Sequence, residues 1–113
     1  MTDPPVPLTL IVATAPDQES GERIVRQLLD ERLAACGNVV PGVISLFRWE
    51  GEVRRESEAL LLLKTREELV DRLFDRVSDL HPYEVPELLS LAVTSGLPDY
   101  CAWVAAETAG VDA

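Results

Sequence analysis

The sequence is poor in several residue types on which catalytic and nucleic-acid-binding sites depend. Its 113 residues include one histidine, two cysteines and 5% aromatic residues. Ten basic residues stand against 20 acidic ones, so the formal net charge is −10. Contacts with phosphates need clustered lysine and arginine, and this balance therefore argues against a nucleic-acid surface or an anionic membrane surface. An acidic surface of this kind provides solubility or attracts cations and positively charged partners.

Long apolar runs and paired cysteines are also missing. The aliphatic run at 59–63 is far shorter than a bilayer span, and no signal-peptide pattern follows Met1. Cys36 and Cys101 are widely separated and form no Cys-x-x-Cys spacing. We therefore expect a cytoplasmic protein with two reduced, packed thiols, the alternatives being a disulfide or a metal-binding thiol pair.

The motifs of the common enzyme classes are absent from the sequence. It contains no Gly-x-Ser-x-Gly, no P-loop, no Gly-x-Gly-x-x-Gly after the first apolar run and no His-Glu-x-x-His. Cys36 follows "RLAA" on the apolar side of an expected helix, with no histidine nearby in sequence, which speaks against a nucleophile. We expect a protein that is not an enzyme.

The apolar fraction of 47% and the chain length predict one compact domain. We expect it to cover 8–107, with flexible termini at 1–7 and 108–113. Hydrophobic periodicity and turn residues set the elements inside this domain. The expected strands are 8–15, 39–49, 53–65 and 87–93, and the expected helices run from the N-cap Asp17 to near Gly37, from about 69 to His81, and from Pro98 or Asp99 onward.

This order predicts an α+β, ferredoxin-like βαββαβ sandwich with a long hairpin between the second and third strands and a short C-terminal helix. In that topology the end of the first strand, the hairpin and the loop after the second helix lie at one end of the sheet. The two hairpin strands, about eleven residues or roughly 36 Å each, are too long for the helices to cover. An apolar edge strand of this length favours a cyclic homo-oligomer joined by strand pairing along 39–65.

Several segments resemble, in order and spacing, the CutA divalent-cation tolerance family. They are "TAPDQES", "ERLAACGNVVPGV", "LFRWEGEV", "LLLKT", "HPYEVPELLSLAV" and "DYCAWV", within residues 8–107. The resemblance implies a cytoplasmic, ferredoxin-like homotrimer, related in architecture to PII signalling proteins and loosely associated with copper and other divalent metals. Some members carry a cysteine before "TAP" and a paired "HHPY", which are linked to copper binding. Here Ala13 and Leu80 stand at those positions, so loss of a thiol and an imidazole weakens any copper site.

His81 and Glu84 are the candidate metal ligands. Metal sites need three or four converging donors, which this segment alone does not supply. The alternative is that the His81 imidazole caps carbonyl groups at a helix C-terminus.

The family resemblance also implies a pocket between subunits, formed by Trp49, Lys64, Tyr83 and Glu84 together with His81. Trp49 and Tyr83 could instead serve only as interface aromatics. Lys64 needs a partner, for which Glu50 or Glu84 is the candidate. The resemblance thus implies a trimer that binds a metal ion or small ligand at intersubunit clefts and acts in metal tolerance. The alternative is a structural or partner-binding trimer without a specific metal site, whose protein partner the sequence does not identify.

Overall fold

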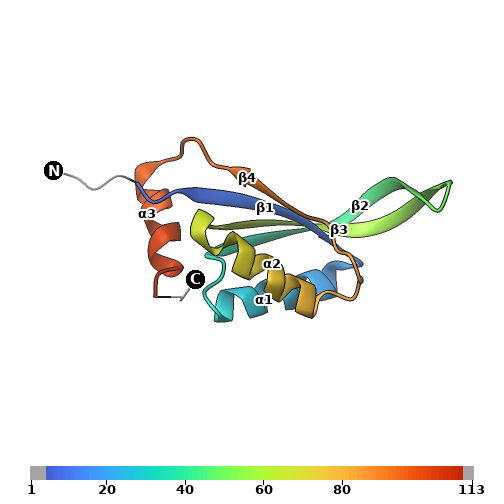
Figure 1. The fold of residues 1–113 in the computed structure, drawn as a ribbon, viewed down its shortest axis with the longest axis horizontal. Coiled ribbons are helices and arrows are strands. Elements are labelled where there is room, and N and C mark those ends of the chain that lie inside the picture. Colours follow the sequence, from blue (N-terminus) through green and yellow to red (C-terminus); the bar gives the residue numbers. More distant parts are fainter. Residues whose placement is uncertain (1–4, 111–113) are drawn as a thin grey trace.

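A four-stranded antiparallel sheet with two helices packed on one face forms the body of the protein (Figure 1). The computed structural model describes residues 5–110. The strand order is β2-β3-β1-β4, which confirms the expected α+β, ferredoxin-like arrangement. The elements are β1 (Leu8–Ala15), α1 (Gln18–Asp30), β2 (Cys36–Trp49), β3 (Glu52–Arg66), the 3-10 turn η1 (Glu67–Leu69), α2 (Val70–Leu80), β4 (Leu88–Ala92) and α3 (Pro98–Glu107).

Aliphatic side chains between the sheet and its two helices form the core. Along β1 and β3 the odd-numbered residues point towards the helices, because successive side chains of a strand point to opposite faces. The fully buried residues of this layer include Ile11, Leu61 and Leu63 from the sheet and Ile24, Leu28, Leu73 and Val77 from the helices. Each buried aliphatic side chain contributes roughly 1.5–3 kcal/mol to folding before entropy is counted.

Helix α1 begins as expected and ends earlier than expected. Asp17 accepts a hydrogen bond from the Ser20 amide at 2.8 Å, and Ser20 completes a capping box, which confirms the N-cap. The helix ends at Asp30 because Arg32 adopts a left-handed backbone conformation with φ 57°. The expectation that it reaches Gly37 was wrong, and so was the placement of Cys36 on a helix, since both residues lie in β2.

Gly37 lies directly beneath α1. A Cβ atom at this position would be 2.5 Å from Cγ1 of Val25, closer than real atoms pack. The glycine therefore lets the start of β2 pass close to the helix.

The other face of the sheet is uncovered over much of its length and is apolar. Register places Leu10 between Lys64 and Leu91, and Val12 between Leu62 and Leu89. Leu89 and Leu91 are 57% and 49% exposed. We call this surface the open face, and define it by Leu10, Val12, Val40, Leu60, Leu62, Leu89 and Leu91.

The β2–β3 hairpin extends well beyond the rest of the sheet (Figure 1). Pairing between β1 and β3 stops at Ala15 and Ala59, whereas β2 and β3 remain paired out to Trp49 and Glu52. We call this projecting part, 43–58, the arm. A register shift between Val40 and Val43, with Gly42 at φ 72°, marks its base. The strands contain 14 and 15 residues, so the predicted overlong hairpin is even longer than expected.

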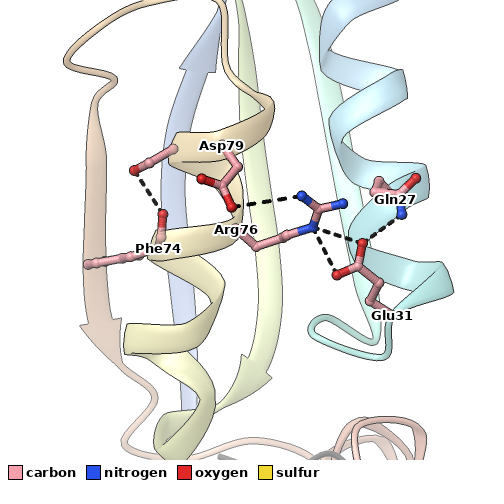
Figure 2. A network of polar contacts seen from close by, with 6 residues as sticks. Gln27, Glu31, Phe74, Arg76 and Asp79 are labelled. Carbon is pink, nitrogen blue, oxygen red and sulfur yellow. Dashed lines mark hydrogen bonds and ion pairs between the residues drawn. The ribbon is translucent and has the colours of Figure 1, made fainter.

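An ion pair joins the C-terminal end of α1 to the middle of α2 (Figure 2). Nε of Arg76 on α2 lies 2.9 Å from both carboxylate oxygens of Glu31, the residue that ends α1. Gln27 also donates to Glu31, and Asp79 lies 3.9 Å from the Arg76 guanidinium. The contact fixes the C-terminal end of α1 against the side of α2.

Helix α3 stands at the end of the sheet opposite the arm (Figure 1). Arg32 and Arg66 donate hydrogen bonds to the carbonyl oxygens of Glu107 and Thr108, where a helix C-terminus favours positive charge. Thr108 is fully buried, so packing extends one residue into the segment expected to be flexible. The expectations for 1–4 and 111–113 fall outside the described residues. No helix among residues 5–110 is long and apolar enough to cross a membrane.

Candidate functional site

His81 joins the end of α2 to the end of β1. Its Nε2 lies 2.7 Å from the carbonyl oxygen of Thr14, and its Nδ1 accepts a hydrogen bond from the Tyr83 amide at 3.0 Å. These partners assign the neutral tautomer with the proton on Nε2. The alternative, that the imidazole caps helix carbonyls, was wrong. The ring contacts the Thr14 carbonyl in the first strand, and only the backbone amide of His81 caps α2, by donating to the Val77 carbonyl.

Tyr83 continues this contact towards the arm. Its ring centroid lies 4.8 Å from that of His81, and its hydroxyl donates to the Glu58 carboxylate at 3.0 Å. Glu58 is only 9% exposed and lies at the base of the arm, paired with Val43. The loop after α2 therefore meets the end of β1 and the hairpin base, as the predicted topology requires.

Electrostatics at this junction favour a neutral phenol. Burial is the main cause that raises the pKa of Tyr83 to about 12, and the hydrogen bond to Glu58 adds to it. The negative charges of Glu58, Glu56 and Asp17 act in the same direction. The hydroxyl therefore remains a hydrogen-bond donor throughout the physiological pH range.

The candidate metal ligands His81 and Glu84 lie in the same loop, but they do not form a metal site within one chain. Both ring nitrogens of His81 are engaged within the chain, while Glu84 is exposed. Among residues 5–110 no group of three or more histidine, cysteine, aspartate or glutamate side chains is arranged to hold a metal ion. The donor set of one chain therefore does not fit a resident metal.

Lys64 lies on the sheet, away from His81 along the strands. It pairs with Leu10, whereas the Thr14 carbonyl bound by His81 belongs to a residue four positions further along β1, roughly 13 Å away at the usual rise. Its ammonium group contacts the Asn38 side-chain oxygen and the Cys36 sulfur. The expectation that Glu50 or Glu84 pairs with Lys64 was wrong within one chain.

Trp49 lies at the far end of the arm. It pairs with Glu52 beside the turn, six residues along β3 from Glu58, and is 56% exposed. One chain therefore brings His81, Tyr83 and Glu84 together in one loop but leaves Trp49 and Lys64 apart from them. Whether these five residues share a pocket between subunits stays a prediction.

A hollow of about 670 Å³ lies elsewhere, at the α3 end of the molecule. Its walls come from Pro5 to Leu8, the segment from Val93 to Gly96, and α3, including Cys101. None of the predicted site residues lines this hollow, so it offers no support for the predicted pocket.

Sequence reasoning missed three participants in these contacts. Glu58 could have been noticed as a carboxylate immediately before the apolar run at 59–63. Asn38 offered no comparable signal. Thr14 contributes its backbone carbonyl, a group present in every residue type, so no side chain identifies it.

Known proteins place these features in one family. Residues 9–107 match the family described as CutA1 divalent ion tolerance protein. The chloroplastic CutA of Arabidopsis thaliana is 40% identical over 99 residues, which cover 88% of this chain and 54% of that protein. The chain thus spans little more than half the length of this plant relative. The divalent-cation tolerance protein CutA of Thermus thermophilus is 42% identical over 99 residues, covering 88% of this chain and 96% of the relative.

Solved structures agree with the fold. The crystal structure of CutA1 from Oryza sativa superposes with a TM-score of 0.91 at 40% identity, over 94% of this chain and 97% of that one. The structure titled periplasmic divalent cation tolerance protein CutA from Archaeoglobus fulgidus gives 0.87 at 34% identity, over 89% and 98%. This chain belongs to the CutA1 divalent ion tolerance protein family.

Proposed function

We propose that this chain acts as a homotrimer in tolerance of, or response to, divalent metal ions such as copper, and that a metal ion or small ligand binds weakly in clefts between its subunits. The observation that carries the proposal is the apolar surface which one chain leaves exposed on the arm and the open face. Family membership supports the relation to divalent ions.

The arm of a single chain exposes many apolar side chains to water. Its exposed apolar side chains are Ile44, Leu46, Phe47, Trp49 and Val53, with Leu46 and Val53 each 68% exposed. Between Ala59 and the tip of the hairpin no third strand pairs with the arm, and an isolated two-stranded ribbon is marginally stable. The outer edges of β2 and β4 also carry unpaired backbone groups. Pairing of these edges with neighbouring copies satisfies both needs.

Assembly around the arms supplies what one chain lacks for a binding cleft. Exposed Glu84 and Tyr83 lie at the arm's base, and Trp49 lies at its tip. A neighbouring copy that extends its arm past this base would add donors and aromatic surface to the loop after α2. The cleft would bind by coordination or charge, and the proposed role involves no catalysis.

A second candidate is a partner-binding or structural trimer with no specific metal site. The engagement of both His81 nitrogens within the chain favours it, because a ligating imidazole must offer a free lone pair. Location in the cytoplasm is part of both proposals. Relatives are named chloroplastic in plants, and one archaeal structure is titled periplasmic.

Light scattering on a size-exclusion column tests the trimer. We expect a trimer at micromolar concentration, and a shift towards monomer for Phe47→Glu on the arm. Leu29→Glu on α1 is the matched control, since both side chains are 39% exposed. A monomeric wild-type protein would refute the assembly.

Titration calorimetry with Cu²⁺ and Zn²⁺ separates the two candidates. The intersubunit metal site predicts saturable heat that weakens in Glu84→Gln and persists in Glu22→Gln, an exposed glutamate on α1. Equal, non-saturating heat in wild type and both variants would leave the partner-binding trimer as the function.

A further inference from the structure

A thiol and an amine face each other at the start of β2. Cys36 and Lys64 are direct partners in the β2–β3 register, and the Lys64 Nζ lies 3.8 Å from the Cys36 Sγ. Lys64 is the only lysine of the chain. The two side chains project from neighbouring strands that are paired without interruption from Cys36 to Val40, so the backbone holds them in register.

The surroundings of this pair are unusual for a lysine. No carboxylate in the described part of the chain forms an ion pair with Lys64, whose other contact is the amide oxygen of Asn38. Tyr100 on α3 borders the sulfur. Burial raises the pKa of Tyr100, and charge interaction and hydrogen bonding with Cys36 act in the same direction. Cys36 is a free thiol that is partly accessible, so a small oxidant can reach it.

We propose that peroxide oxidises Cys36 and that Lys64 captures the oxidised sulfur as a covalent cross-link between β2 and β3. In the first step the Cys36 sulfur attacks one oxygen of hydrogen peroxide and the O–O bond breaks. The sulfur is oxidised by two electrons to a sulfenic acid, while the peroxide is reduced and leaves as water.

In the second step Lys64, having released its extra proton to solvent, attacks the sulfur through Nζ. An S–N bond forms, the S–O bond breaks, and the hydroxyl leaves as water with a proton from the amine. The sum is one thiol, one amine and one hydrogen peroxide giving one sulfenamide and two waters. No further oxidant is needed, and reduction by an external thiol restores both side chains.

The second cysteine provides an internal comparison. Cys101 lies on α3 with its sulfur against Gly96, where an added Cβ would be 2.6 Å away. The single lysine is in contact with Cys36, so Cys101 has no amine of this kind available. Oxidation of Cys101 should therefore stop at the sulfenic acid or proceed up the oxidation ladder.

The cross-link would fasten the first residue of β2 to β3 at the end of the sheet far from the arm. It is an oxidant-responsive fastening of the body, and it uses Lys64, which is also one of the residues predicted for the intersubunit cleft. Its presence or absence does not depend on the outcome of the metal titrations.

Peptide mapping of peroxide-treated protein tests the proposal on the wild-type chain. We expect an intact mass lower by two hydrogens, and a tryptic species in which 33–48 is joined to 56–66 without cleavage after Lys64. Dithiothreitol should release the two peptides. A disulfide between Cys36 and Cys101, or oxidised cysteines with no joined peptide, would overturn the proposal.

Variants test whether the cross-link joins the Lys64 nitrogen to the Cys36 sulfur. Lys64→Arg keeps the positive charge but lacks the amine, so we expect loss of the joined peptide and a dimedone-trapped sulfenic acid at Cys36 instead. Cys101→Ser should retain the joined peptide at the wild-type yield. Persistence of a joined species in Lys64→Arg, or its loss in Cys101→Ser, would contradict the assignment.

Discussion

The Tyr83 hydroxyl and the Glu58 carboxylate are 3.0 Å apart, and their hydrogen bond joins the loop after α2 to the base of the arm. The two residues are 25 positions apart in sequence. Because the arm otherwise pairs only with itself, this bond fixes its base to the helical layer, and the neighbouring His81–Thr14 contact fixes the end of β1 to the same layer.

Replacing Tyr83 by phenylalanine should destabilise the protein by about 1–2 kcal/mol. A hydrogen bond to a charged group is worth about this much, and its removal leaves the nearly buried Glu58 without that donor. Urea unfolding measures the change. An unchanged stability in Tyr83→Phe would show that the bond contributes little.

Alkaline titration should show that Tyr83 ionises about two pH units above an ordinary tyrosine. Its folded pKa of about 12 exceeds the ordinary value of 10.0, so the folded state holds the proton more tightly. The associated stability is complete below pH 10 and is lost as the pH rises towards 12. Phenolate absorbance of wild type minus Tyr83→Phe isolates this group, and a transition near pH 10 would contradict the expectation.

His81→Ala should reduce the free energy of unfolding by about 2–3 kcal/mol. The substitution removes two hydrogen bonds and leaves a cavity under a side chain that is only 7% exposed. Chemical denaturation in metal-free buffer measures the loss. A variant as stable as wild type that fails to bind Cu²⁺ would instead assign His81 to a ligand role.

Glu31→Gln should cost about 0.5–1 kcal/mol at neutral pH, as expected for a partly exposed ion pair with good geometry (Figure 2). The hydrogen bond from Gln27 is the main cause that lowers the pKa of Glu31 below its ordinary value of 4.5, and Arg76 adds to this effect. A lowered folded pKa gives stability that is present above 4.5 and lost as the pH falls through the folded value.

Urea unfolding of wild type and Glu31→Gln across the acid range measures this dependence. The two curves should converge in acid. Glu22→Gln, an exposed substitution on the same helix, is the control for removing a surface carboxylate. A difference between wild type and Glu31→Gln that persists in acid would contradict the ion-pair explanation.

The order and type of the elements could be predicted from sequence because each follows from local periodicity. Ile24, Val25 and Leu28 repeat at helical spacing, and Asp17 is a good N-cap, so α1 was placed correctly at its start. Its end was missed because Arg32, a residue with no special left-handed preference, supplies the left-handed turn that a glycine usually provides.

The candidate site was less predictable because its contacts are long-range. His81 and Thr14 are 67 residues apart, and the acceptor is a backbone carbonyl. Lys64 was expected to seek a carboxylate, yet strand register places Cys36 and Asn38 beside it. Only the pairing of β2 with β3 determines these neighbours, and single-sequence periodicity does not determine register.

The self-pairing of the arm sets a rule for how its length can change in related chains. Removing one residue from each strand near the tip keeps the two strands paired. The turn then faces the opposite side of the hairpin relative to the rest of the arm, because side chains alternate between the two faces. Removing two from each strand keeps the same faces. Insertions and deletions in this hairpin should therefore accumulate in steps of four residues, leaving the register of the body from Ala59 onward untouched.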